Sequence, residues 1–140
     1  MKVALGCDHG GFGLKETLLA LLKQLGHDVV DCGTMNGESV DYPDIAAAVC
    51  DRVAAGECER GILICGTGIG ISMAANRNPA IRAALCAESF SARMSREHND
   101  ANVLCLGGRT LGPGLAEDIV KVWLVTEFAG GRHQRRISMF

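Results

Sequence analysis

The segment Ile62-Leu63-Ile64-Cys65-Gly66-Thr67-Gly68-Ile69-Gly70-Ile71 runs from a short apolar stretch directly into a turn with glycine at every second position. A short apolar run that ends in glycines is typical of a buried strand, and we expect a helix to follow from Ile71. Three glycines let backbone N–H groups converge on a negative oxygen, and a helix N-terminus adds the positive end of its dipole. This pattern predicts an anion-binding turn beside Cys65 and a thiol that ionises readily. The competing interpretation is that Cys65 is only the last buried residue of a strand.

The composition limits the class of protein to which this chain can belong. With 140 residues, 48% of them hydrophobic, the chain is long enough to bury a core, and we expect one domain over residues 1–140. A net charge of −2 and a single tyrosine and tryptophan argue against nucleic acid as a partner. The apolar runs are too short to cross a membrane, and residues 1–9 contain no secretory signal, so we expect a cytoplasmic protein.

Seven cysteines are spread along the chain, and their number is odd. Most lie in or beside apolar segments, with no Cys-x-x-Cys pair and no zinc-finger spacing of cysteine and histidine. We therefore expect reduced thiols and no structural metal.

Short apolar runs alternate with longer amphipathic ones along the chain. The runs at 2–5, 29–32, 61–65, 81–86 and 102–106 are predicted strands. Helices are predicted between them: leucines from Leu14 to Leu25 share one face of a helix that ends at Gly26, and Pro43 and Pro113 begin two more. The strands are continuously apolar, which is typical of a parallel sheet covered on both faces. The sequence therefore predicts a three-layer α/β/α, Rossmann-like sandwich with a five-stranded parallel sheet.

Polar residues follow the first, third and fifth predicted strands. Asp8 and His9 follow the first strand, the glycine turn from Gly66 follows the third, and Arg109 follows the fifth. The carboxyl ends of parallel strands lie at one edge of the sheet, where such sheets bind their ligands. We therefore expect these residues to meet in one crevice.

The glycine turn after Cys65 does not match the common nucleotide-binding motifs. It lacks the spacing of GxGxxG and of GxxxxGK, and Ile71 occupies the position where a cysteine phosphatase has its arginine. A cysteine beside an oxyanion site remains suited to proton abstraction next to a carbonyl, where an enediolate oxygen develops negative charge. Thr67 can hydrogen-bond that oxygen or the thiolate, which makes it a candidate catalytic residue, or it can be only a turn residue.

Other polar residues are candidates for contacts with a phosphorylated ligand. Asp8 can accept hydrogen bonds from sugar hydroxyls and His9 can bind a hydroxyl or a phosphate, unless the pair forms only an Asx turn. His98 lies at the end of the helix after the fourth strand, where it can act as an acid or only complement the helix dipole. Arg132 and Arg136 are four residues apart and can grip a phosphate from one helical face, although basic runs are also typical of solvated surfaces.

Five segments of the chain together resemble ribose-5-phosphate isomerase type B, a family that also includes allose-6-phosphate and galactose-6-phosphate isomerases. The resemblance runs nearly end to end. The matching segments are GCDHGG at 6–11, DYPD at 41–44, GILICGTGIGISMAANR at 61–77, SREHNDANVLCLGGR at 95–109 and GGRHQRR at 130–136.

The resemblance implies a reversible aldose–ketose isomerisation of a sugar phosphate without a metal or an organic cofactor. It assigns Cys65 as the base that moves a proton between C1 and C2 through a cis-enediolate, and His98 as the acid that opens the furanose ring. Some relatives use a glutamate after the glycine turn, but this chain has Ile71 there, so the base is expected to be Cys65. The remaining matches are to the anion hole, the sugar contacts and the phosphate contacts of the family: Gly66, Thr67, Gly68, Ile69, Gly70, Asp8, His9, Asn99, Arg109, Arg132, His133 and Arg136.

Members of this family form dimers or tetramers with each active site built from two subunits, which implies a homodimer or a dimer of dimers here. The leading expectation is interconversion of ribose 5-phosphate and ribulose 5-phosphate, and a six-carbon substrate such as allose 6-phosphate is the nearest alternative. A non-catalytic phosphosugar-binding module is disfavoured because binding needs no acidic thiol beside an oxyanion site. A redox sensor is disfavoured because Cys65 has no evident resolving partner.

Overall fold

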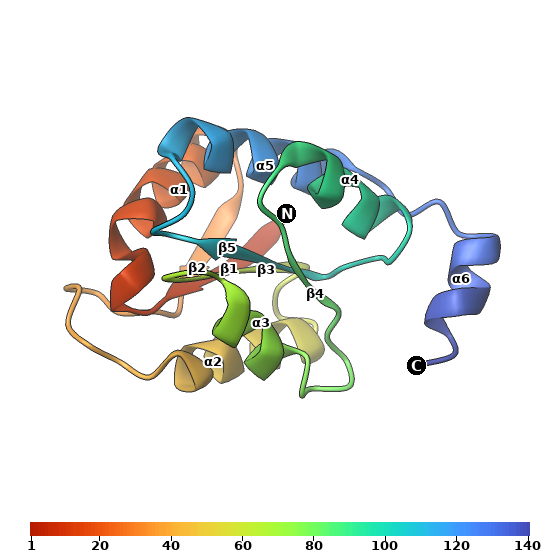
Figure 1. The fold of residues 1–140 in the computed structure, drawn as a ribbon, viewed down its shortest axis with the longest axis horizontal. Coiled ribbons are helices and arrows are strands. Elements are labelled where there is room, and N and C mark those ends of the chain that lie inside the picture. Colours follow the sequence, from red (N-terminus) through yellow and green to blue (C-terminus); the bar gives the residue numbers. More distant parts are fainter.

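The computed structural model describes residues 1–140 and is built on one parallel β-sheet (Figure 1). Its strands are β1 (Lys2–Cys7), β2 (Asp28–Asp31), β3 (Arg60–Cys65), β4 (Ala83–Leu85) and β5 (Val103–Gly107). The strand order is β2-β1-β3-β5-β4, and every neighbouring pair is parallel. Helices cover both faces, so the predicted three-layer α/β/α sandwich with five parallel strands is confirmed.

Two sets of helices enclose two separate apolar cores. Helices α1 (Phe12–Gln24), α4 (Ser89–Glu97) and α5 (Pro113–Val125) cover one face, and α2 (Tyr42–Ala54) and α3 (Ile69–Ala75) cover the other. Alternate residues of β3 enter opposite cores: Ile62 and Ile64 pack in the core of α1, α4 and α5, whereas Leu63 and Cys65 pack in that of α2 and α3. Both faces of the strand are therefore apolar, and its last residue, Cys65, lies on the α2–α3 side.

The helix boundaries follow the turn and cap residues of the sequence. Pro43 and Pro113 lie in the first turns of α2 and α5, as predicted. Helix α3 begins at Ile69, two residues earlier than predicted, because Gly68 adopts a φ of +79° and the Thr67 Oγ1 accepts the Ile69 N–H at 3.2 Å. No helix of the chain combines the length and hydrophobicity that a membrane crossing needs.

Strand β4 is an edge strand and is shorter than the predicted run 81–86. Asparagine side chains make hydrogen bonds with the backbone at the start of this strand. The Asn102 Oδ1 accepts the Arg82 N–H at 2.8 Å, and the Asn76 amide bonds both the N–H and the C=O of Ala83, at 2.8 and 2.9 Å. A 3-10 turn, η1 (His9–Gly11), links β1 to α1, and α6 (Arg132–Ile137) stands away from the sheet near the C-terminus (Figure 1).

Candidate active site

The loops that follow β1, β3 and β5 pack directly against one another at the carboxyl edge of the sheet. A Cβ at Gly10 would lie 2.9 Å from the backbone nitrogen of Gly66, and one at Gly108 would lie 2.6 Å from the Gly10 carbonyl oxygen. The N–H of Gly108 also donates to the Cys65 carbonyl at 2.8 Å. Because glycine leaves room for this close approach, the three strand ends lie together, as the parallel order predicts.

Cys65 ends β3, and its side chain is directed at the backbone of the glycine turn. The Gly68 N–H donates to the Cys65 Sγ at 3.1 Å, and Cys65 is 5% exposed. The backbone N–H groups of Gly66, Thr67 and Gly70 make no hydrogen bond within the chain. Helix α3 has only seven residues, so the anion-binding capacity of this turn rests on these amides more than on a helix dipole.

The other six cysteines lie in different surroundings from Cys65. Burial raises the pKa of Cys7 to about 12 and the pKa values of Cys50 and Cys86 to about 11. Burial also raises the pKa values of Cys32 and Cys58, and it raises that of Cys105 well above the usual range. None of these six sulfurs accepts a backbone N–H. All seven cysteines are free.

Asp8 and His9 lie beside this turn and line a hollow of about 430 Å³. Asp8 is buried, and its Oδ1 accepts the Gly10 N–H at 2.8 Å, so the Asx turn considered from the sequence is present. His9 is exposed. The rest of the hollow is formed by residues 39–41 and by the first turn of α2, residues 42–44.

Tyr42 is a residue of this site that the sequence pattern did not single out. It lines the same hollow as Asp8 and His9, and a Cβ at Gly70 would lie 2.8 Å from its ring carbon Cζ. The sequence marked Pro43 as the start of a helix and DYPD as a segment that resembles the isomerase family, but it gave Tyr42 no role. Its contact with the glycine turn is a tertiary one, and no local signal predicts it.

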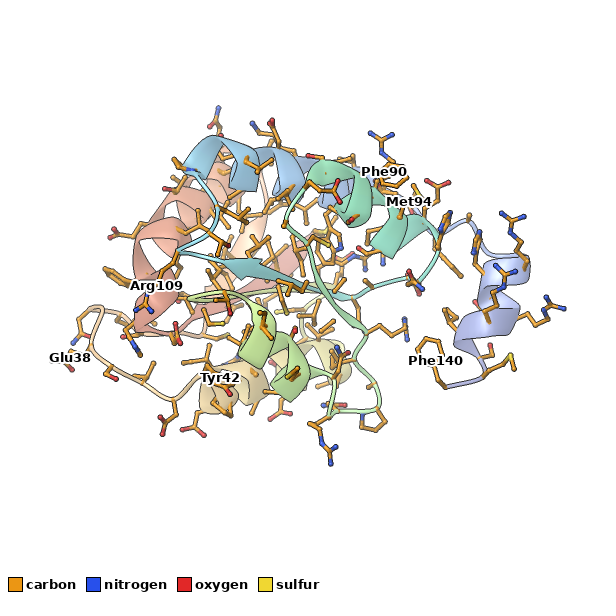
Figure 2. All side chains as sticks on the ribbon, in the orientation of Figure 1. Glu38, Tyr42, Phe90, Met94, Arg109 and Phe140 are labelled. Carbon is orange, nitrogen blue, oxygen red and sulfur yellow. The ribbon has the colours of Figure 1, made fainter.

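Arg109 completes the polar groups at this edge. Its N–H donates to the Gly66 carbonyl at 3.0 Å, and its guanidinium Nη1 would lie 3.4 Å from a Cβ at Gly66. The side chain is exposed and lies beside the turn that follows Cys65 (Figure 2). We refer to Asp8, His9, residues 65–70 and Arg109 as the carboxyl-edge group.

A second group of candidate residues gathers at the other end of the sheet. The rings of His98 and His133 stack with centroids 4.1 Å apart and an interplanar angle of 10°. His98 caps the C-terminus of α4, and His133 lies in α6. Partial desolvation and the charges of His98, Arg132 and Arg136 lower the pKa of His133. We refer to His98, Asn99, Arg132, His133 and Arg136 as the amino-end group.

Hydrogen bonds place the amino-end group near the start of the strands. The Asn99 carbonyl accepts from the Nε of Arg82, which directly precedes β4, at 3.1 Å. Three residues after Asn99, the Asn102 carbonyl accepts the N–H of Gly61, the second residue of β3. Figure 2 shows Arg109 at one end of the molecule and Phe140, which follows α6, at the other.

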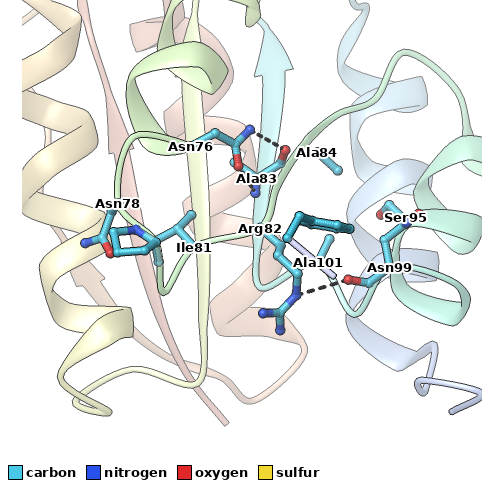
Figure 3. Close-up of a pocket in the computed structure, with 11 residues that line it drawn as sticks. Asn76, Asn78, Ile81, Arg82, Ala83, Ala84, Ser95, Asn99 and Ala101 are labelled. Atoms are coloured by element: carbon cyan, nitrogen blue, oxygen red, sulfur yellow. Dashed lines mark hydrogen bonds between the residues drawn. The ribbon is translucent and has the colours of Figure 1, made fainter. Parts of the chain in front are cut away.

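A cavity of about 640 Å³ lies beside the amino-end group (Figure 3). Asn99 and Arg82 lie on one side of it, and Asn76, Asn78 and Ile81 lie on another. Phe140 also lines it. Within one chain, therefore, the structure brings the carboxyl-edge group together and the amino-end group together, but it does not bring the two groups to each other.

Comparison with known proteins gives a consistent assignment. The family model described as Ribose/Galactose Isomerase matches residues 3–140. Ribose-5-phosphate isomerase B of Escherichia coli is 52% identical, over 98% of this chain and 92% of the relative. A ribose-5-phosphate isomerase B structure from Clostridium thermocellum superposes with a TM-score of 0.98 at 57% identity, covering 99% of this chain and 94% of that one.

A further relative is named for a smaller sugar. The D-erythrulose-4-phosphate isomerase of Pectobacterium atrosepticum is 42% identical, over 94% of this chain and 87% of the relative. These matches span nearly the whole length of both partners. The chain belongs to the ribose/galactose isomerase family.

Proposed function

We propose that this chain interconverts ribose 5-phosphate and ribulose 5-phosphate, with Cys65 as the base. The observation that carries the proposal is the 3.1 Å hydrogen bond from the Gly68 N–H to the Cys65 Sγ, beside three unpaired amides in the same turn. A sulfur that accepts a backbone N–H is well placed to act as a thiolate base. The neighbouring amides are suited to hold the oxygen that becomes negative when a proton leaves the adjacent carbon.

The reaction follows from these roles. His98 gives a proton to the ring oxygen as the bond from that oxygen to C1 breaks. The C1 hydroxyl passes its proton to water, from which His98 is protonated again, leaving the open-chain aldehyde. The Cys65 thiolate then removes the C2 proton, and the electron pair moves onto O1 to form a cis-enediolate held by the amides of residues 66–70. A proton passes from O2 to O1, and the Cys65 thiol returns its proton to C1, which gives the ketose.

The remaining candidate residues bind the substrate in this scheme. Asp8, His9 and Asn99 hold the sugar hydroxyls, and Thr67 contacts the developing oxyanion or the thiolate. Phosphate is held by guanidinium groups, which match its geometry in a bidentate manner, and by an imidazole; these groups belong to Arg109, Arg132, His133 and Arg136. All seven cysteines are free, which suits a reducing compartment, and we place the reaction in the cytoplasm.

The same scheme requires two copies of the chain. Base and acid lie at opposite ends of one molecule, and a two-fold axis perpendicular to the strands sets the carboxyl edge of one copy against the amino end of the other. Exposed apolar side chains on the elements around edge strand β4 provide the contact surface: Ile69 and Met73 on α3, Leu85 on β4 and Phe90 on α4. The resulting homodimer, alone or paired again, contains two composite sites.

Relatives differ in the number of carbon atoms in the substrate for which they are named. A relative with 42% identity is named for a four-carbon substrate, and the resemblance of the motifs extends to six-carbon isomerases. We therefore test the purified chain in EDTA with ribose 5-phosphate, allose 6-phosphate and D-erythrulose 4-phosphate. The proposal predicts the highest kcat/KM on ribose 5-phosphate, and a higher value on either of the others reassigns the substrate. A folded protein that binds phosphate but turns over none of the three is a binding module.

A further inference from the structure

Arg96, in the last turn of α4, is a buried cation that belongs to neither group of candidate residues. Its side chain is 2% exposed. One guanidinium nitrogen, Nη1, donates to the Asp100 Oδ1 at 2.8 Å and to the Ala101 carbonyl at 2.7 Å, and Nε donates to the Thr126 carbonyl at 3.3 Å. The guanidinium also lies over the Trp123 ring, 5.9 Å from its centroid. A buried charge is costly unless it is well bonded, and these contacts meet that requirement for Arg96.

These three hydrogen bonds join two segments that are far apart in the sequence. Asp100 and Ala101 belong to the turn that follows His98, and Thr126 begins the segment that leads to α6. A backbone hydrogen bond from the Ala129 N–H to the Glu97 carbonyl, 3.0 Å, runs between the same two segments. Arg96 therefore lies at the junction on which the relative positions of His98 and α6 depend.

The turn that carries His98 and Asn99 is held in an unusual conformation. Asp100 has a φ of +45° and is the one residue other than glycine with a positive φ. Its carboxylate bonds Arg96 through one oxygen and Arg82 through the other, at 2.8 and 3.1 Å, and the Arg82 Nε also donates to the carbonyls of Asn99 and Asp100. Such a backbone conformation persists where several hydrogen bonds hold it in place, and the hydrogen bonds from Arg96 are the buried ones.

We propose that Arg96 is a positioning residue that sets His98 and Asn99 at a fixed distance from Arg132, His133 and Arg136, so that acid and phosphate contacts form one rigid surface. The inference rests on the proposed function, because it takes these residues to be substrate contacts. The stacked His98 and His133 rings are the direct product of this junction. His133 faces Arg132, Arg136 and Glu97 as well as His98, so without the junction the positive groups of this surface would tend to separate.

Two substitutions and one control test this role in the full-length protein. Arg96→Met removes all three hydrogen bonds, and Arg96→Lys can still reach Asp100 and Ala101 but lacks the Nε bond to Thr126. Lys15→Met is the control, because Lys15 is also a buried cation, 3% exposed, and its Nζ bonds Asp31 and the carbonyls of Gly33 and Thr34 on the other side of the molecule. The probes are inorganic phosphate affinity by calorimetry, NMR titration of the histidine rings, and KM and kcat on ribose 5-phosphate.

We expect Arg96→Met to weaken phosphate binding and raise KM together by roughly tenfold, about the worth of one charge-assisted hydrogen bond. The pKa of His133 should rise toward its ordinary value as the rings separate, whereas Lys15→Met should lower thermal stability without moving that titration. Arg96→Lys should give an intermediate phosphate affinity.

The proposal is overturned if Arg96→Met resembles Lys15→Met, with reduced stability but unchanged phosphate affinity and histidine titration. If Arg96→Met does not fold, Arg96→Lys decides by the same two readouts. Phosphate affinity and histidine titration can both be measured without turnover. If Arg96→Met changes both in a protein that has no isomerase activity, the positioning role is supported and the proposed function is rejected.

Discussion

The carboxyl-edge group and the amino-end group are held in place by different kinds of contact. At the carboxyl edge, three loops touch through glycine backbones, and the Cys65 Sγ is bonded by a backbone N–H. At the amino end, the positions depend on one buried guanidinium, a stacked pair of histidines and the short helix α6, which stands away from the sheet (Figure 1). Backbone contacts at strand ends therefore fix the carboxyl-edge group, whereas side-chain contacts fix the amino-end group.

The largest expected effect distinguishes a catalytic cysteine from a cysteine that only packs in the core. Cys65→Ser should lower kcat by about 10²- to 10⁴-fold, as expected for loss of a general base, with little change in thermal stability. Cys105→Ala is the matched control, since Cys105 is fully buried on the adjacent strand, two residues deeper in the sheet. It should cost roughly 1 kcal/mol of stability and leave kcat unchanged. Comparable kcat values for the two variants would contradict the assignment of the base.

The next effect probes the amino-end group alone. Arg132→Ala should raise KM for ribose 5-phosphate by about 10- to 100-fold, the range for a hydrogen bond to a charged group, and reduce inhibition by inorganic phosphate in parallel. Because Arg132 is exposed, the melting temperature should not change. Arg135→Ala is the control, since Arg135 lies in the same helix but outside the group. Equal effects of the two substitutions would indicate only a general charge effect.

A third prediction tests the backbone contacts of the carboxyl edge. Gly10→Ala should destabilise the protein by roughly 1–3 kcal/mol and reduce kcat, because its Cβ would meet the Gly66 backbone at 2.9 Å and separate the loops. Gly13→Ala is the control, since nothing lies within 4 Å of its Cβ position in α1, and there alanine should add up to about 1 kcal/mol of stability. Chemical denaturation measures the stability of both variants. A Gly10→Ala protein with unchanged stability and kcat would show that the loops do not depend on close backbone contact.

The smallest effect concerns the helix that carries His98 at its end. The Ser91 side chain, followed by the backbone N–H groups of Ser91 and Phe90, lowers the pKa of Glu88, the N-cap of α4, by hydrogen bonding to its carboxylate. A lowered pKa in the folded state means that ionised Glu88 stabilises the fold above its unfolded pKa, and this contribution is lost as the pH falls through the folded pKa. Glu88→Gln should therefore lower the melting temperature at pH 7, with a difference from wild type that shrinks on acidification. A constant difference across this range would argue against the cap.

Much of the carboxyl edge could be predicted from the sequence, because it follows from strand ends in a parallel sheet. The positions of Asp8, Cys65 and Arg109 were expected at one edge, and they lie there. The remote position of His98 also has a local signal: a helix after a parallel strand runs back across the sheet, so its C-terminus lies at the amino end. No local signal predicts the contacts of Tyr42 with Gly70 and of Arg96 with Thr126, because each contact joins segments that are distant in the sequence.

If one site needs the carboxyl-edge group of one subunit and the amino-end group of another, subunits with complementary defects should restore activity to each other. Cys65→Ala and His98→Ala chains, each nearly inactive alone, are co-expressed with different tags, and the heterodimer is isolated. Each heterodimer should contain one intact and one doubly defective site, so we predict about half of the wild-type kcat per dimer. A heterodimer no more active than the two parent proteins would contradict the composite site and place base and acid in the same chain.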